Sequence, residues 1–119
     1  MRTFTFASLQ VTDLEASKDF YTQKLGSEID NVNPQACVFK YRQGEASFAI
    51  RTPLESLEGK TLGTGVALWF AIDGKADELK EQFLAKGITT AGPLIKTPFG
   101  KAFHVSDLDG YKLTFLEAN

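Results

Sequence analysis

Residues that bind metals or form disulfides are scarce in this sequence, which has one cysteine, one histidine and one methionine in 119 residues. The single cysteine, Cys37, excludes an intramolecular disulfide and is expected to be a small apolar filler of the core. One histidine and one cysteine also fall short of the three or four converging ligands that a transition-metal site needs. A chain of this length predicts one domain with one core, built without disulfides or a structural metal.

Long apolar runs and an excess of positive charge are also missing. The net charge is −2 at pH 7, and the basic residues are scattered, so no basic patch for nucleic acid or for a membrane surface is expected. No apolar run approaches the length of a signal peptide or of a membrane span, and the sequence therefore predicts a cytoplasmic protein. The acidic residues lie mostly in helix first turns, loops and a linker, where capping and solvation explain them. A metal site made of carboxylates alone stays open in principle.

The N-terminal part of the chain predicts a strand followed by a helix. Alternating polar and apolar residues indicate a half-buried strand over residues 2–11, with Phe6 on one face and core residues on the other. The helix begins in a capping-box pattern of Thr12 and Glu15, for which Asp13 is a competing cap, and it ends at Gly26.

Two strands and their turn complete the first half. A polar loop that contains Pro34 leads to strands over residues 36–42 and 46–51, joined by a turn at Gln43, Gly44 and Glu45. The order strand, helix, strand, strand is a βαββ unit.

The second half repeats this order after a linker. Residues 52–65 have three glycines, a proline and no sustained period, which is typical of a linker. A strand over 66–72, a helix over 75–86 and a loop with glycine and prolines follow. Two alternating runs, 102–105 and 111–116, flank turn residues and predict a β-hairpin.

The two halves correspond in length. Residues 11–26 match 72–87, and the hairpin 39–49 matches 104–114, which indicates an internal duplication. The expected division is a first module at about 1–51, a linker at 52–65 and a second module at about 66–119.

Two motifs in this arrangement carry a resemblance to a known family. They are V-x-D-L-E-A-S-x-x-F-Y-x-x-x-L-G at 11–26 and G-x-x-x-x-x-x-D-x-D-G-Y at 100–111. In order and spacing the chain resembles, over essentially its whole length, the vicinal oxygen chelate superfamily, which includes glyoxalase I, extradiol dioxygenases, and fosfomycin and bleomycin resistance proteins. Leu108 departs from the pattern, because the family usually has proline there. The resemblance implies an α+β fold in which two tandem βαββ modules form curved mixed β-sheets around a cleft.

The same resemblance implies where a metal would be held. Enzymes of the family bind a divalent metal through His, Gln or Glu from equivalent strands of the two modules. In this sequence those positions are Phe6, Ala49, Ala67 and Thr114, with Leu68 as a one-residue alternative to Ala67. Since none of these residues is a metal ligand, we expect neither a metal nor another cofactor.

Strand alternation around the four positions predicts the residues that line the cleft. The predicted ligand-binding residues are Phe6, Ser8, Gln10, Phe39, Ser47, Arg51, Ala67, Trp69, His104 and Thr114, and the same alternation adds Ala49, Ala71, Lys112 and Leu116. Phe39 and His104 are included as matched positions of the two hairpins. Phe99 and the linker are expected to form a mobile edge of the cleft. Such an aromatic lining with a few polar groups suits a planar or amphipathic organic molecule.

Three functions are compatible with this lining. The first is a metal-free binding protein similar to bleomycin resistance proteins, which would sequester a drug or an aromatic metabolite, and which the resemblance predicts to be a homodimer. The second is an enzyme of the same fold, glyoxalase-, lyase- or dioxygenase-like, with displaced metal ligands or with His104 as an acid or base. The third is a structural or regulatory homodimer whose cleft is plugged by Trp69 and Phe6. The absent ligands favour the first over a metalloenzyme, whereas the aromatic content does not separate the first from the third.

Overall fold

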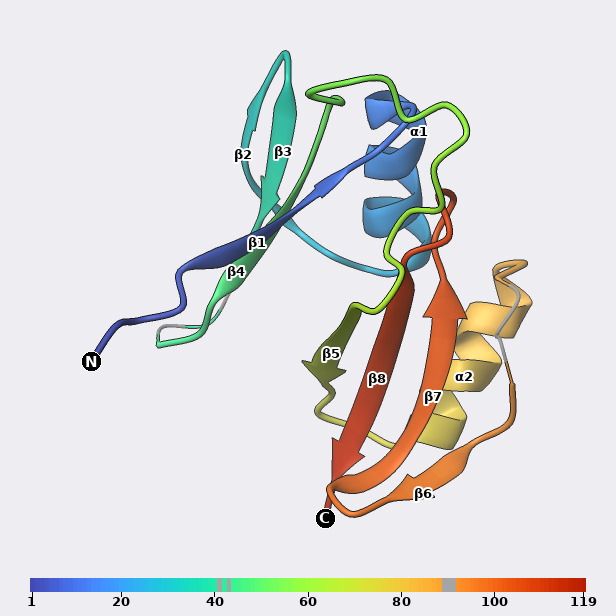
Figure 1. Cartoon of the computed structure of the whole chain (residues 1–119). Helices are drawn as coiled ribbons and strands as arrows, with labels where there is room; N and C mark the ends of the chain where they lie inside the picture. The colour runs from blue at the N-terminus through green and yellow to red at the C-terminus, as the bar shows by residue number, and fades with distance from the viewer. Residues whose placement is uncertain (41, 43, 89–91) are drawn as a thin grey trace. The chain divides into compact units, whose positions relative to one another are not determined.

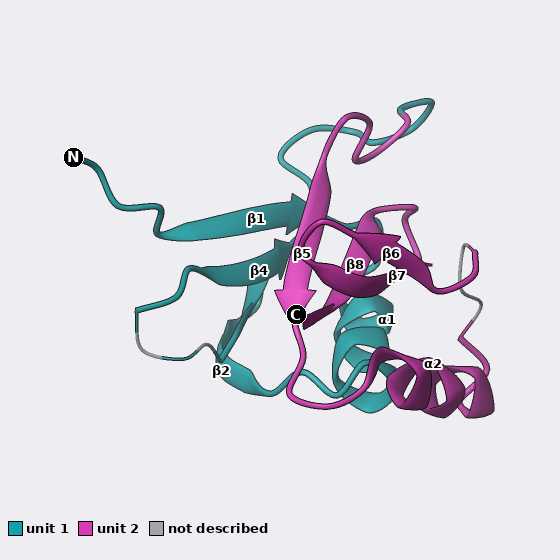
Figure 2. Cartoon of the chain, turned by 90° about the horizontal axis from the view of Figure 1, so that it is seen from below, with its two compact units in different colours: residues 1–60 teal, residues 61–119 magenta. Residues whose placement is uncertain are grey.

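The protein is described by a computed structural model over residues 1–40, 42, 44–88 and 92–119. The chain divides into two compact units, Met1–Lys60 and Thr61–Asn119 (Figure 2). Each unit contains one mixed four-stranded sheet and one helical segment, so the predicted α+β fold with two tandem modules is confirmed. Neither unit has, in its described part, a helix with the length and apolar character that crossing a membrane requires.

The first unit forms a sheet in the order β1-β4-β3-β2 (Figure 1). Its elements are β1 (Phe6–Gln10), α1 (Leu14–Asp19), the π-helical segment η1 (Phe20–Lys24), β2 (Ile29–Asn33), β3 (Ala36–Phe39) and β4 (Ser47–Arg51). β1 runs parallel to β4, and the other pairs are antiparallel. The prediction of a loop before β3 was wrong, because β2 pairs with β3 there. The strand predicted over 36–42 ends at Phe39, and Tyr41 and Gln43 lie outside the described residues.

The second unit repeats this topology in the order β5-β8-β7-β6. Its elements are β5 (Ala67–Ala71), α2 (Ala76–Ala85), β6 (Ile95–Thr97), β7 (Gly100–Ser106) and β8 (Lys112–Ala118). The predicted hairpin is confirmed as β7 and β8, which are paired in one register from Gly100 and Ala118 to Ser106 and Lys112. β6 lies in a segment that was predicted to be a loop. Each module is therefore βαβββ, with one more short edge strand than predicted.

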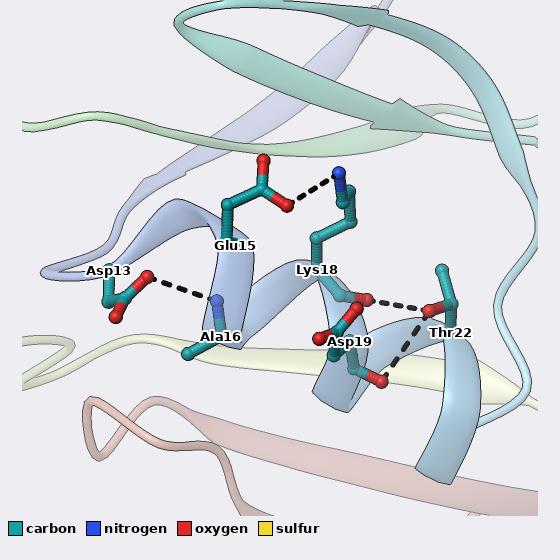
Figure 3. Close-up of polar contacts among 6 residues, drawn as sticks. All are labelled: Asp13, Glu15, Ala16, Lys18, Asp19 and Thr22. Carbon is teal, nitrogen blue, oxygen red and sulfur yellow. Dashed lines mark hydrogen bonds and ion pairs between the residues drawn. The ribbon is translucent and has the colours of Figure 1, made fainter.

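The first helix is capped by Asp13, whose Oδ1 accepts a hydrogen bond from the Ala16 N–H at 3.0 Å (Figure 3). Of the two N-cap residues that the sequence predicts, Thr12 and Asp13, the structure therefore uses Asp13. Glu15 pairs instead with Lys18, at 2.8 Å between Oε2 and Nζ. The helical segment continues through η1 to Gly26, which has a φ of 80° that glycine adopts without steric cost.

The second helix receives its N-terminal partner from the sheet. Lys75 precedes α2 and makes no side-chain capping bond, but Glu117 of β8 accepts a hydrogen bond from the Ala76 N–H at 2.7 Å through Oε1. A carboxylate at this end also suits the positive end of the helix dipole. This bond fixes the start of α2 to the face of the sheet that Glu117 occupies.

Aromatic side chains join each helical segment to one face of its own sheet. In the first unit Tyr21 lies 5.4 Å from Phe39 and 5.7 Å from Phe48 between ring centroids. In the second unit Phe83 of α2 lies 5.9 Å from Phe103 and 5.2 Å from Phe115. Because side chains alternate along a strand, the residues between these aromatics point to the opposite side, which we call the helix-free face of each sheet.

Candidate functional site

The helix-free face of the first sheet carries most of the predicted binding residues of that unit. Residues paired across neighbouring strands share a face, and the pairs of β1 and β4 are Phe6 with Ser47, Ser8 with Ala49, and Gln10 with Arg51. Leu9 and Ile50, which alternate with them, are buried. Phe6 remains 54% exposed. Gln10 accepts a hydrogen bond from the Leu54 N–H at 2.9 Å, so this face also holds the start of the following segment.

Phe39 does not belong to that face, and its prediction as a ligand-binding residue was wrong. Its side chain is 1% exposed. It packs against Tyr21 and lies 4.6 Å from Phe48 between ring centroids. Phe39 is therefore a core residue on the helical side of the first sheet.

The error has a definite cause in the length of the hairpin connection. Val38 pairs with Ala49, whereas the corresponding pair of the second unit is His104 with Thr114. The chain runs eleven residues from Val38 to Ala49 but ten from His104 to Thr114. Since a shift of one residue moves a side chain to the other face, the true counterpart of His104 is Val38. The prediction assumed that the two hairpins have the same length, and it therefore missed the extra residue in the first one.

A row of three predicted binding residues crosses the second sheet. Trp69 of β5 pairs with Thr114 of β8, and Thr114 pairs with His104 of β7. The Nδ1 atom of His104 lies 2.8 Å from the Thr114 Oγ1 atom, within hydrogen-bonding distance. Thr114 is buried, while the Trp69 side chain is 47% exposed. The row therefore presents an accessible indole beside Thr114, which in turn orients His104 through a hydrogen bond.

A second exposed aromatic residue adjoins this row. The ring of Phe99 meets Trp69 edge-on, with 6.2 Å between centroids and 86° between ring planes. Phe99 lies between β6 and β7, where its N–H donates to Thr97 Oγ1 at 3.1 Å. Such an edge-to-face pair is a favourable aromatic geometry, and it places a second apolar surface beside the indole.

The electrostatic surroundings of His104 keep its imidazole neutral near pH 7. Partial burial lowers the pKa of His104 below its ordinary value of 6.5, and the positive charge of Lys112 lowers the pKa further. His104 makes no hydrogen bond to a carboxylate of the described chain. A neutral imidazole held at Nδ1 can donate or accept a proton through its other nitrogen, according to its tautomer.

The four positions that the resemblance assigns to metal ligands do not provide a set of ligands in this chain. They carry Phe6, Ala49, Ala67 and Thr114, and among these side chains only the threonine hydroxyl has a donor atom. The alternative position, Leu68, is also apolar. Over residues 1–40, 42, 44–88 and 92–119, no three side chains of His, Cys, Asp or Glu come together as a metal site would need.

Comparison with known proteins identifies the family. A sequence profile described as the Glyoxalase/Bleomycin resistance protein/Dioxygenase superfamily matches residues 3–115. The chain belongs to this superfamily, which confirms the resemblance found in its motifs. A search of curated protein sequences returned no match.

Solved structures share the fold at low sequence identity. Lactoylglutathione lyase from Agrobacterium tumefaciens is 22% identical, with a TM-score of 0.75 over 98% of this chain and 94% of that one. The bleomycin-binding protein from Streptomyces verticillus, solved with copper(II)-bleomycin, is 20% identical, with a TM-score of 0.72 over 100% of this chain and 98% of that one. TnmS3, an antibiotic binding protein from Streptomyces sp. CB03234, is 20% identical, with a TM-score of 0.76 over 100% and 98% of the two chains.

Proposed function

We propose that this protein binds a planar or amphipathic organic molecule on the helix-free face of its second sheet. The observation that carries the proposal is the row formed by Trp69, Thr114 and His104, in which an exposed indole lies beside a hydrogen-bonded polar pair. The indole supplies a stacking surface, and the polar pair fixes the orientation of the bound molecule. This combination of aromatic area and few polar groups is typical of small-molecule sites.

The neighbours of Trp69 along β5 support this role. Ala67 and Ala71 precede and follow it on the same face, and both are exposed. Because their side chains are single methyl groups, they leave room beside the indole for a ring to lie against it. A tryptophan that served only as a core plug would be surrounded by larger apolar residues.

The proposed binding is metal-free, which is supported by the residues at the four positions that the resemblance assigns to metal ligands: Phe6, Ala49, Ala67 and Thr114. The family relatives support sequestration of a drug or an aromatic metabolite, since one is a bleomycin-binding protein and another is an antibiotic binding protein. A cytoplasmic homodimer is part of this proposal. The other residues predicted to bind the ligand share the helix-free face of the first sheet, and their role stays a prediction: Phe6, Ser8, Gln10, Ser47 and Arg51.

A second candidate function rests on the His104–Thr114 pair. An imidazole that is neutral near pH 7 and held at one nitrogen has the properties of a general acid or base. In this reading the protein is an enzyme of the same fold, as the relationship to a lactoylglutathione lyase structure allows. Chemical change of a bound molecule, rather than its recovery intact, distinguishes this function from sequestration.

Replacement of Trp69 by alanine tests the proposed function. The probe is 8-anilinonaphthalene-1-sulfonate, a planar amphipathic dye whose fluorescence rises on binding. We expect saturable binding of one dye per chain and about tenfold weaker binding by Trp69→Ala, since loss of one aromatic stacking surface costs roughly 1–3 kcal/mol. Circular dichroism checks that the variant is folded.

The matched control is Leu84→Ala, which also truncates an exposed large apolar residue but lies on α2, away from the row. Its affinity for the dye is expected to equal that of the unchanged protein. Equal affinities of Trp69→Ala and Leu84→Ala would remove Trp69 from the site and would favour a filled, purely structural face.

A further inference from the structure

The helix-free face of the second sheet contains no acidic residue. By strand register it consists of Ala67, Trp69 and Ala71 of β5, Lys112, Thr114, Leu116 and Ala118 of β8, Gly100, Ala102, His104 and Ser106 of β7, and Ile95 and Thr97 of β6. The acidic residue of these strands, Glu117, lies on the other face, where it accepts the hydrogen bond from Ala76. The chain has 15 acidic residues and a net charge of −2. This face is therefore locally positive on a protein that is acidic overall.

Lys112 supplies the positive charge of the face. It lies two residues before Thr114 on β8, so both side chains point to the same side, and it pairs with Ala67 and Ser106 on the neighbouring strands. Lys112 is exposed. It forms no ion pair with a carboxylate in the described parts of the chain. Its ammonium group is thus available to a bound anion.

The positive charge of Lys112 lies close to Trp69 and His104, the residues on which the ligand is proposed to bind. It is one of the two causes that lower the pKa of His104. Lys112 is also a diagonal neighbour of Trp69, because Trp69 pairs with Thr114. Adjacent strands about 4.8 Å apart and two residues along a strand put the two Cα atoms about 8 Å apart. A two-ring aromatic molecule with a peripheral anionic group spans this distance.

Three of the four strands of the first sheet have a similar distribution of charge. On the helix-free face of β1, β4 and β3 the charged residue is Arg51, and the others are apolar or uncharged polar residues. Arg51 donates from Nε to the Thr52 carbonyl at 3.0 Å. Apart from β2, which carries Asp30 at its register shift, the helix-free strand faces of both modules combine one cation with an exposed aromatic ring and no carboxylate.

We propose that the ligand is an aromatic anion, whose ring lies on Trp69 and whose carboxylate, sulfonate or phosphate group lies at Lys112. This inference rests on the proposed function and specifies its ligand class. An unpaired lysine attracts an anion and repels a cation, and no acidic side chain on the face offsets either effect. Aromatic cations are therefore selected against.

Two dyes with one ring system test the charge preference. They are 8-anilinonaphthalene-1-sulfonate and N-phenyl-1-naphthylamine, which has the same rings without the sulfonate. Binding is followed by quenching of Trp69, the only tryptophan of the chain, so the signal reports on dyes near the row. The measured quantity is the ratio of the two affinities, which cancels the general hydrophobic attraction of the rings.

In Lys112→Gln we expect this ratio to shift about fivefold against the sulfonate, as loss of one exposed charge contact predicts. The control is Lys96→Gln. Lys96 pairs with Lys101, in the set of residues that alternates with His104, so it lies on the other face of the same sheet. It should leave the ratio unchanged.

The outcomes separate the two proposals. If both dyes quench Trp69 and the ratio is the same in Lys112→Gln as in the unchanged protein, the anion preference is overturned while the binding function stands. If neither dye quenches Trp69, the proposed function itself fails, and the inference fails with it.

Discussion

Replacing Gly100 by alanine is expected to lower the free energy of unfolding by about 3 kcal/mol, one of the two largest effects in the molecule. Gly100 begins β7 with a φ of 142°, a backbone conformation that residues other than glycine rarely adopt. An added Cβ would overlap the carbonyl oxygen of Glu117 and lie 3.0 Å from the Ala118 Cα atom. Since these neighbours are backbone atoms of β8, the strand itself would have to move.

Chemical denaturation measures this effect, with Gly74→Ala as the control. A Cβ at Gly74 meets no atom within 4 Å, and its backbone does not have positive φ. Gly74→Ala should therefore change stability by no more than about 0.5 kcal/mol. Gly100 directly follows Phe99. The close approach of Gly100 to β8 therefore also fixes the turn that places the Phe99 ring against Trp69. Equal stabilities of the two variants would contradict the described packing of β7 on β8.

Truncation of Phe103 to alanine is expected to cost about 3–5 kcal/mol of stability, because it leaves a cavity in a closely packed core. The Phe103 side chain is 0% exposed. Its ring lies 5.5 Å from Phe115 in a stacked pair and 5.9 Å edge-on from Phe83 of α2. These contacts attach α2 to the sheet on the face opposite the proposed site.

Phe99→Ala is the matched control, because it removes the same atoms from a ring that is 65% exposed. Its cost in denaturation experiments is expected to be below about 1 kcal/mol. A small loss of stability in Phe103→Ala, similar to that in Phe99→Ala, would mean that α2 does not cover the sheet face on which Phe103 lies. The distinction between a helix-covered and a helix-free face would then be lost.

Strong local patterns made most of the fold predictable. The hairpin of β7 and β8 alternates regularly around turn residues, and the helices have recognisable ends at Gly26 and Gly87. β2 and β6 were missed for a physical reason. Both are short edge strands, and β2 is exposed at every position. Such strands owe their conformation to pairing with a neighbour, which local composition does not reveal.

The candidate site was predictable where strand register could be inferred. The resemblance indicated Thr114 and His104, and strand alternation added Trp69. Their pairing across β5, β8 and β7 puts the three residues in one row. The prediction for Phe39 was wrong because the first hairpin connection has one extra residue. This residue moves each side chain of β3 to the opposite face from the one that alignment with the second module predicts. A sequence comparison of the two halves cannot detect this offset, since both Val38 and Phe39 are apolar.

The two faces of the second sheet thus have different roles: one packs against α2, and the other carries the proposed binding site. Phe103, Phe115 and Phe83 form a packed layer that stabilises the sheet. On the opposite face the exposed indole of Trp69 lies between two alanines along β5 and beside Thr114 on β8. This separation explains how a binding surface can exist without weakening the core, because each strand contributes alternate residues to the two tasks.

The most direct test of the central claim is an NMR titration of the ¹⁵N-labelled protein with 8-anilinonaphthalene-1-sulfonate. We predict that the largest shift changes fall on the Trp69 indole N–H and on the backbone amides of Ala67, Trp69, His104 and Thr114, with smaller changes along Ala76–Ala85 of α2. Changes concentrated on α2, with the signals of Trp69 and Thr114 unmoved, would contradict a ligand-binding role for the helix-free face.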